Sequence, residues 1–304
     1  MADPLRPLSA RELLDRTFSL YRHHFKLFVG VSIIGPVATF MYRLLYAGGA
    51  IAAARSDSRS STVSMAIGIA IGVTIMLLAG LAISSAATGK AVAAVCLDRN
   101  ISIAGSYRAL KGRNWRIIGI VFSVFMRAFL GGALFIGLGM IALGSAAALG
   151  YNSRAEAGAI GMVCGSIAVM AAILALMVIY VRYAVAVQAC VVEDISRKLA
   201  LERSRFLTGG DGGRVVAMYG IFAMFGLVMG FLLEAPTLLL GGQGVAFQIS
   251  GAVASFVAAA LTAPVGTIGM SLVYYDERVR KEAFDRQAMM NALAPPLQAN
   301  ASVV

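Results

Sequence analysis

Few side chains in this sequence could perform chemistry, and those few are scattered. The two histidines, His23 and His24, are adjacent, and neighbours on a helix point about 100° apart, so one metal or acid/base site can hardly use both. The three cysteines, Cys96, Cys164 and Cys190, lie far apart in apolar sequence with no CxxC pattern, as is typical of small side chains in helix packing. We therefore predict no catalytic residue, no metal site and no cofactor.

One glycine-rich stretch, "TGGDGGR" at 208–214, invites comparison with a phosphate-binding loop. It follows an expected helix rather than a strand and lacks the GK[ST] ending of a P-loop, which favours a flexible elbow. Backbone amides at the start of a spanning helix, with Arg214 beside them, could nevertheless hold a lipid phosphate. Arg113 and Arg116 occupy the comparable place before an earlier span, with Trp115 between them as an interface anchor.

Five charged residues fall within the apolar stretches, Arg43, Lys90, Arg127, Arg182 and Glu234, and of these Glu234 and Arg127 are the candidates for a role. An intramembrane ionisable group is costly and is by default a candidate for function. Pro236, just after Glu234, predicts a break in that helix. One hypothesis is an ion pair between Arg127 and Glu234. Alternatively, the flexible stem of Arg127 allows its guanidinium to reach the inner membrane interface.

The elements that must position these residues are apolar and long. The chain of 304 residues is 59% hydrophobic and 13% charged, with a mean hydropathy of +0.82, whereas soluble domains carry about 25% charged residues. Six stretches exceed the roughly 20 residues that cross a bilayer core, and none alternates with period two, which excludes a β-barrel. We expect an all-α polytopic membrane protein, without a cleaved signal peptide, whose spans are about 27–54, 63–97, 117–149, 157–192, 215–241 and 245–275.

The basic residues predict the orientation. Of the 26 Lys and Arg, 21 fall in the N-terminal segment, in the second and fourth connections with their adjoining helix ends, and in the C-terminal block. The positive-inside rule then places both termini in the cytoplasm. Because the basic clusters adjoin spans, anionic headgroups are a nearer partner than nucleic acid. The candidate headgroup contacts are Lys111, Arg113, Arg116, Arg203, Arg205, Arg214, Arg278 and Arg280.

The last span ends in "YYDERVRKEAFDR", 274–286, a dense block of acids and bases. We interpret Tyr274 and Tyr275 as aromatic-belt residues at the inner interface. The pairs Asp276/Arg280, Glu277/Lys281 and Glu282/Arg286 lie at i,i+4 with the acid first, which favours a short solvated helix. Pro295 and Pro296 then predict a disordered tail over 293–304.

Parts of the sequence repeat. "LDRTFSL" at 14–20 is similar to "LERSRFL" at 201–207, and "SYRALKGRNWRIIG" at 106–119 is similar to "SRFLTGGDGGRVV" at 204–216. We infer a single membrane domain over 1–292 made of three parallel repeats, about 8–97, 98–192 and 193–292, each with a surface helix and a helical hairpin. The first surface helix starts with a capping box, "SARE" at 9–12, and is either interfacial or packed on other cytoplasmic segments.

Three motifs together resemble a known family. "LLDRTFSLYRHHF" at 13–25, "ALERSRFLTGG" at 200–210 and "LVYYDERVRKEAFD" at 272–285 are similar to the membrane domain associated with bacterial glycerophosphoryl diester phosphodiesterases and its stand-alone relatives. The resemblance implies an all-helical domain of the bacterial cytoplasmic membrane, mostly without assigned activity. The phosphodiesterase reaction belongs to a separate soluble barrel in that family, so no catalysis is implied for this chain.

These observations lead to two functional hypotheses. The first is a non-enzymatic membrane module that handles lipid or organises the membrane through anionic headgroups. The alternative is a transporter of a small or amphipathic solute, which would need a polar cavity near midplane formed by Glu234, Gln243, Gln248, Thr262 and a break at Pro264. GxxxG pairs at Gly68/Gly72, Gly161/Gly165 and Gly226/Gly230 favour packing within the bundle, or alternatively a homo-oligomer or a partner membrane protein.

Overall fold

The computed structural model describes residues 8–54, 59–97, 99–148, 154–210, 212–239 and 245–282, and within these ranges every regular element is a helix. The expected tail, 293–304, lies outside them. The long helices are α3 (Ile34–Ala54), α4 (Arg59–Cys96), α6 (Asn114–Ala148), α7 (Arg154–Arg182), α10 (Gly212–Leu239) and α11 (Val245–Glu282). The short helices are α1 (Ala10–His23), α2 (Phe25–Ser32), α5 (Ile103–Arg108), α8 (Ala186–Glu193) and α9 (Arg197–Thr208).

Membrane-spanning length is the main property of the long helices. Five of them are apolar enough over 26 to 37 described residues to cross a bilayer, and a sixth span forms if α2 and the first part of α3 count as one segment bent by 44°. The prediction of an all-helical, multi-pass membrane protein is confirmed at this level. The fourth expected span, about 157–192, corresponds to the candidate span Met162–Glu193, within which a turn separates α7, which ends at Arg182, from the short α8.

The bend between α2 and α3 has a local cause in Pro36. A proline cannot donate to the carbonyl four residues earlier, here that of Ser32, so the chain breaks at Ile33 and restarts with the proline in the first turn of α3. Ser84 of α4 donates its hydroxyl to the Ser32 carbonyl at 2.9 Å, and the Ser32 hydroxyl lies 3.0 Å from that of Thr88. Two hydroxyls of α4 therefore satisfy the polar groups at this bend.

The short helix α5 attaches at the same bend through Tyr107. The Tyr107 hydroxyl donates to the carbonyl of Val31, and burial raises the pKa of Tyr107 to about 12. The phenol thus keeps its proton at neutral pH and acts as a donor.

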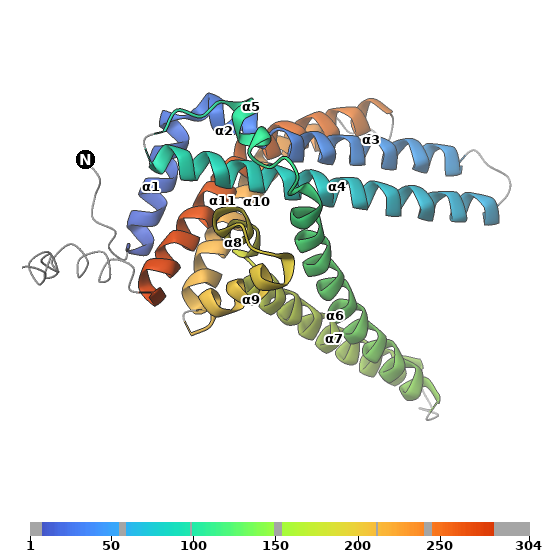
Figure 1. Cartoon of the computed structure of the whole chain (residues 1–304). Coiled ribbons are helices and arrows are strands. Elements are labelled where there is room, and N and C mark those ends of the chain that lie inside the picture. The colour runs from blue at the N-terminus through green and yellow to red at the C-terminus, as the bar shows by residue number, and fades with distance from the viewer. Residues whose placement is uncertain are drawn as a thin grey trace, which may run out of the picture.

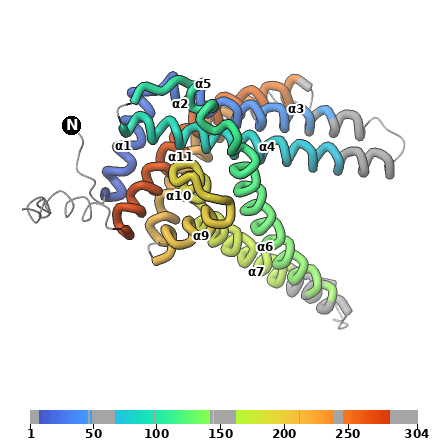
Figure 2. The backbone as a smooth tube through the Cα atoms, viewed as in Figure 1, coloured from blue at the N-terminus to red at the C-terminus, as the bar shows by residue number. Residues whose placement is uncertain are grey.

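Consecutive long helices pack as pairs, α3 with α4, α6 with α7 and α10 with α11, and the first two pairs diverge from one end of the molecule (Figure 1). The tube in Figure 2 shows the short helices gathered at that end. Helix α11 runs through the middle and also contacts α1, α2, α3, α4, α8 and α9. Over half of its most apolar window is buried, 56%, against 6% for the span that contains α7, so α11 is the core helix and α7 is peripheral.

The core lies near the short helices. One buried cluster joins Leu13 of α1 and Phe28 of α2 to Val265, Ile268 and Tyr274 of α11. A second cluster joins α4, the start of α6, α8 and α9. Packing is therefore densest where the short helices meet the spans.

Most of the GxxxG glycines do not make the expected contacts within the bundle. A Cβ built on Gly68, Gly72, Gly165 or Gly230 would meet nothing within 4 Å, and Gly161 lies in a part of α7 whose side chains are not described. For these four described positions, the expectation of packing within the bundle is wrong. Close approach occurs at other glycines, where such a Cβ would lie 2.7 Å from Ala38 at Gly80 and 2.5 Å from Ala168 at Gly139, and would overlap the Phe222 ring at Gly269.

Gly80→Leu is expected to destabilise the α3/α4 pair, because the new side chain would overlap Ala38, and overpacking typically costs about 1–3 kcal/mol. The melting temperature of the protein purified in detergent measures the effect. Gly72→Leu on the same helix adds the same side chain in open space and should melt like the wild type. Equal melting of the two variants would contradict the observed packing.

Candidate functional site

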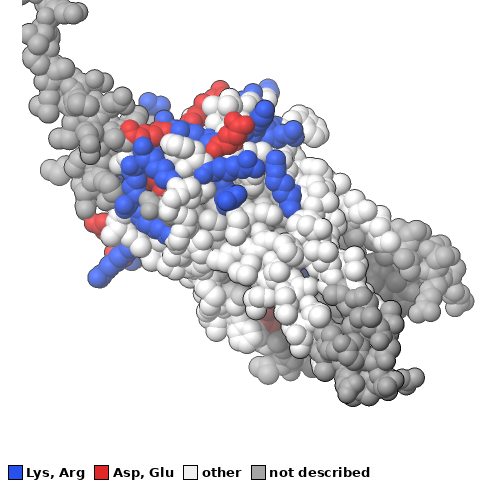
Figure 3. All heavy atoms as spheres, turned by 90° about the horizontal axis from the view of Figure 1, so that it is seen from below, with Lys and Arg blue, Asp and Glu red and all other residues white. Residues whose placement is uncertain are grey.

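Charged side chains gather at one end of the molecule, whereas most of the described surface in the view of Figure 3 is neither acidic nor basic. We call this region the polar end. It comprises α1, α5, α8 and α9, the turn 109–113, the first turns of α6 and α10, and the last turns of α11 from Tyr274 to Glu282. It contains all eight basic residues expected to contact headgroups.

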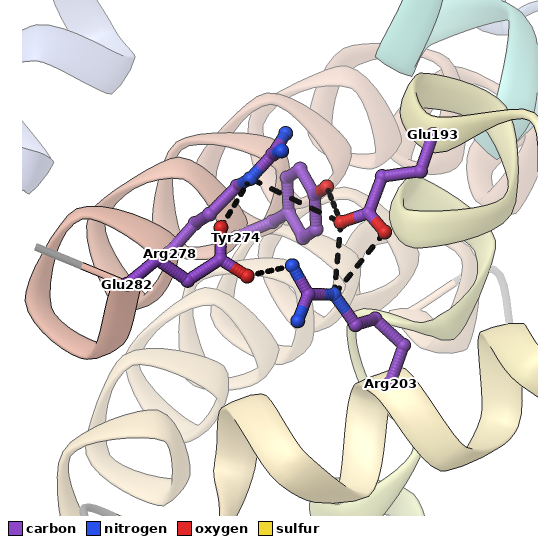
Figure 4. Close-up of polar contacts among 5 residues, drawn as sticks. All are labelled: Glu193, Arg203, Tyr274, Arg278 and Glu282. Atoms are coloured by element: carbon purple, nitrogen blue, oxygen red, sulfur yellow. Dashed lines mark hydrogen bonds and ion pairs between the residues drawn. The ribbon is translucent and has the colours of Figure 1, made fainter. Parts of the chain in front are cut away.

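Glu193, the last residue of α8, lies at the centre of a network that joins three helices (Figure 4). The Nε of Arg203, from α9, lies 3.0 Å from Oε1 and 3.1 Å from Oε2 of Glu193. The Tyr274 hydroxyl donates to Oε1 at 2.7 Å. Glu282 pairs with Arg203 on one side and with Arg278 on the other, the latter at 2.8 Å. Alternating charges thus connect α8, α9 and the end of α11.

Asp276 forms a second network that fixes the start of α1. Its side chain is 1% exposed and pairs with Arg214 at 2.5 Å and with Arg280 at 2.9 Å. Its Oδ1 accepts the backbone N–H of Leu8 at 2.6 Å, and both arginines donate to the Leu8 carbonyl. Residues 268 positions apart in sequence are therefore held by one buried carboxylate.

The expectation of a short solvated helix after Tyr275 is wrong. The segment continues α11 to Glu282, and Tyr274, Asp276 and Glu277 are buried at 0%, 4% and 0% exposure. The i,i+4 pair of Asp276 with Arg280 is present, but Glu282 pairs with Arg203 and Arg278, and Arg286 lies outside the described residues. The carboxylates of Asp276 and Glu282 are therefore neutralised by arginine side chains rather than solvated by water.

Lys281, which was expected to pair with Glu277, points elsewhere. Its ammonium donates to the carbonyls of Phe206 and Gly209. These carbonyls lie at the C-terminal end of α9, where a cation also interacts favourably with the helix dipole. Lys281 therefore connects the end of α11 to the end of α9.

Arg113 and Arg116 converge on Asp194, at 2.6 Å and 3.3 Å. Asp194 caps α8 with a positive φ of 53°, which Asp tolerates better than most residues. Lys111 is exposed, and the described residues give it no ion pair. Trp115 is 87% exposed, and its place at the membrane interface stays a prediction.

Arg127 and Glu234 do not meet, so the pairing hypothesis is wrong. Arg127 donates to Ser123 at 2.7 Å and lies over the ring of Tyr183. Glu234 of α10 pairs instead with Arg43 of α3 at 3.0 Å. At 1.5 Å per residue Glu234 lies about 33 Å along α10 from Gly212, a full hydrocarbon thickness of about 30 Å, which places this pair far from the polar end.

Among the residues proposed for a midplane cavity, those that the structure describes show no cavity shared with Glu234. Thr262 donates to the carbonyl of Ala258 in its own helix at 2.8 Å, Gln248 is exposed, and Gln243 lies outside the described residues. Both Pro236 and Pro264 lie inside continuous helices, so the expected breaks are wrong.

A cleft of about 660 Å³ opens between the end of α7, the end of α9 and the start of α10. We call it the α7/α10 cleft. It contains the glycine-rich elbow, but Arg214, the cation expected beside that elbow, turns to Asp276 and Leu8. Two other arginines line the cleft, Arg182 and Arg205. Sequence reasoning missed Arg182 because it sits in an unbroken apolar run; its signal was the adjoining Tyr183, an aromatic next to a cation.

Metal-binding side chains do not cluster in the part of the chain that the structure describes: no three His, Cys, Asp or Glu residues come together there. The ring nitrogen Nδ1 of His23 lies 2.8 Å from the Ser19 carbonyl of its own helix. The side chains of the polar end therefore show ion pairing and hydrogen bonding rather than a ligand set.

Comparison with protein-family models, with curated proteins and with solved structures finds no match to this chain. The resemblance to the membrane domain of glycerophosphoryl diester phosphodiesterases therefore stays a prediction based on the three motifs.

Asp276→Asn is expected to destabilise the protein by about 2–3 kcal/mol. This is less than the 3–5 kcal/mol typical of breaking a buried pair, because Arg214 and Arg280 keep 21% and 31% side-chain exposure. Thermal unfolding in detergent and the rate of proteolysis near Leu8 measure the loss. Asp15→Asn, on the exposed face of α1, serves as the control, and an equal effect of both changes would refute the assignment.

Arg43→Gln and Glu234→Gln should each lower stability by about 1 kcal/mol, the upper range for partly exposed pairs, since the side chains are 40% and 35% exposed. Exchange of the two residues, Arg43→Glu with Glu234→Arg, should recover most of the loss. Recovery should be incomplete because Arg43 also donates to the Gly251 carbonyl at 3.4 Å. Thermal unfolding of the single and exchanged variants is the measurement, and an exchanged variant no more stable than the singles would exclude the pair.

Proposed function

We propose that this protein is a non-enzymatic integral membrane module that contacts anionic phospholipid headgroups through its polar end. The observation that carries the proposal is the gathering of cations at one end of an apolar helical bundle (Figure 3). In this proposal the polar end lies at the cytoplasmic face of a bacterial inner membrane, where anionic lipids attract basic residues. Lipid handling or membrane organisation would follow from that contact.

The balance of charge in the polar end supports lipid contact. Four of its carboxylates, Glu193, Asp194, Asp276 and Glu282, are already paired with arginines. The chain carries a net charge of +11, so cations remain in excess after this internal pairing. Two exposed cations, Lys111 of the polar end and Arg182 at the end of α7, have no ion pair among the described residues.

The internal pairing also changes which residues we assign to lipid. Six of the eight candidates, Arg113, Arg116, Arg203, Arg214, Arg278 and Arg280, hold elements of the polar end together. Their guanidinium groups are partly exposed and contribute to the positive electrostatic potential of the polar end. Their first role, however, is structural. Lys111 and the neighbouring Trp115 are the better placed headgroup contacts.

The repeat hypothesis fits within the same proposal. The helix pairs α3/α4, α6/α7 and α10/α11 each follow short helices. If each pair begins and ends at the cytoplasmic face, the three units, about 8–97, 98–192 and 193–292, are parallel copies. A cytoplasmic position of both termini follows from that arrangement and from the positive-inside rule.

Trp115 provides a direct test because it is the single tryptophan and is highly exposed at the polar end. In nanodiscs, phosphatidylglycerol brominated on its acyl chains should quench Trp115 more strongly than brominated phosphatidylcholine at the same mole fraction. Lys111→Gln should reduce the difference, and salt should weaken it by screening. Equal quenching by the two lipids at low salt would overturn headgroup selection.

A further inference from the structure

We propose that the α7/α10 cleft binds the phosphate of an anionic membrane phospholipid, with Arg182 and Arg205 as the contacting cations. The proposal rests on the lipid-contacting role proposed above and adds to it a defined site. The cleft volume of about 660 Å³ falls in the range of roughly 300–1,000 Å³ that is usual for small-molecule sites.

Arg205 is held in position before any ligand arrives. Its Nε donates to the Tyr183 hydroxyl at 2.8 Å, and its guanidinium carbon lies 5.1 Å from the centre of the Tyr183 ring. A guanidinium presents five N–H donors, so these contacts leave donors for a phosphate oxygen. Fixing the side chain beforehand reduces the entropy lost on binding.

Arg182 differs from the paired arginines of the polar end. Its backbone carbonyl accepts the hydroxyls of Ser204 at 2.9 Å and Thr208 at 3.3 Å, which fixes the end of α7 against α9. Its side chain is exposed, and none of the described residues lining the cleft is acidic. Among the described lining residues the two arginines are the only charged ones and place positive charge in the cleft, whereas Asp211 of the elbow lies outside the described residues.

The glycine elbow leaves the backbone open to a ligand. Gly210 has a φ of +92°, and a Cβ on Gly212 or Gly213 would meet nothing within 4 Å. Lys281 holds the preceding turn through the Phe206 and Gly209 carbonyls. A phosphate can therefore approach the main chain of the elbow closely, next to the turn that Lys281 holds in place.

The apolar wall favours a lipid over free phosphate as the occupant. Met177, Val178 and Val181 of α7 line the cleft together with Val216 of α10. Exposed apolar side chains continue along α7 from Met177 at 44% and Val178 at 52% to Leu174 at 55%. A phosphate at the arginines thus has hydrocarbon-facing surface beside it, where an acyl chain can lie.

Native mass spectrometry of the protein released from nanodiscs of mixed phosphatidylglycerol and phosphatidylcholine tests the site. One retained phosphatidylglycerol is expected, with about fivefold weaker retention in Arg182→Gln or Arg205→Gln and about twenty-five-fold in the double variant, as follows from about 1 kcal/mol per basic residue near anionic headgroups. Lys198→Gln, an exposed charge on α9 outside the cleft, is the matched control and should retain lipid like the wild type. Equal loss in Lys198→Gln, or no loss in the double variant, would overturn the site.

A steric variant separates binding from charge and from misfolding. Gly213→Leu fills the cleft without altering charge and should also reduce retention, whereas Gly220→Leu, in open space further along α10, should not. Melting temperatures close to the wild type identify folded variants. Retention unchanged in a folded Gly213→Leu protein would contradict the cleft as the binding place.

Two further arms separate the possible outcomes. Glycerol phosphate should displace the retained lipid poorly, and displacement by millimolar glycerol phosphate alone would overturn the assignment to a lipid. Unchanged Trp115 quenching by anionic lipid in the Arg182/Arg205 double variant, together with unchanged lipid retention, would reject this cleft but leave the proposed function standing. Equal quenching of Trp115 by brominated phosphatidylglycerol and brominated phosphatidylcholine in the wild type would reject the proposed function itself.

Discussion

A carboxylate buried at the end of an apolar helix must be neutralised, and the polar end is organised around this constraint. Asp276 is almost inaccessible to solvent, and an uncompensated buried charge costs several kcal/mol. Arg214 of α10 and Arg280 of α11 supply the compensation, and the same two side chains bind the Leu8 carbonyl before α1. Since α11 also carries the core, the ionic contacts at its end and the apolar contacts along its length fix the same set of helices.

Ion pairing and headgroup binding place different demands on a basic residue. A pairing arginine needs a carboxylate and partial burial, as Arg203 has with Glu193, whereas a lipid-binding cation must be accessible and without an internal partner. Among the described residues Arg203 meets the first demand, and Arg182, exposed and without an ion pair, is the residue that we propose for the second. This division explains how a strongly basic surface can have a rigid fold while keeping charge available for lipid phosphate.

The sequence predicted what depends on neighbouring residues and missed what depends on tertiary register. Hydropathy located the spans, and the Ser9/Glu12 capping box is present in α1, because both are short-range properties. Burial of Asp276 was not predictable from i,i+4 spacing, since its second arginine comes from another helix. The partner of Glu234 was missed for the same reason: which residue of α3 faces it depends on how α3 and α10 are aligned. The α7/α10 cleft required knowing that α7 ends at Arg182, because the apolar sequence continues beyond that residue into α8.

The bend at Pro36 couples two positions that are distant in sequence. Because the proline lacks an N–H, the Ser32 carbonyl depends on the Ser84 hydroxyl of another helix, and in hydrocarbon no water would replace it. Loss of the hydroxyl at 84 would therefore be harmful with proline at 36 and nearly harmless with alanine there, where a backbone N–H could reach Ser32 directly. The two positions form a thermodynamic cycle with a coupling energy, so the tolerance of position 84 to substitution depends on one residue of α3.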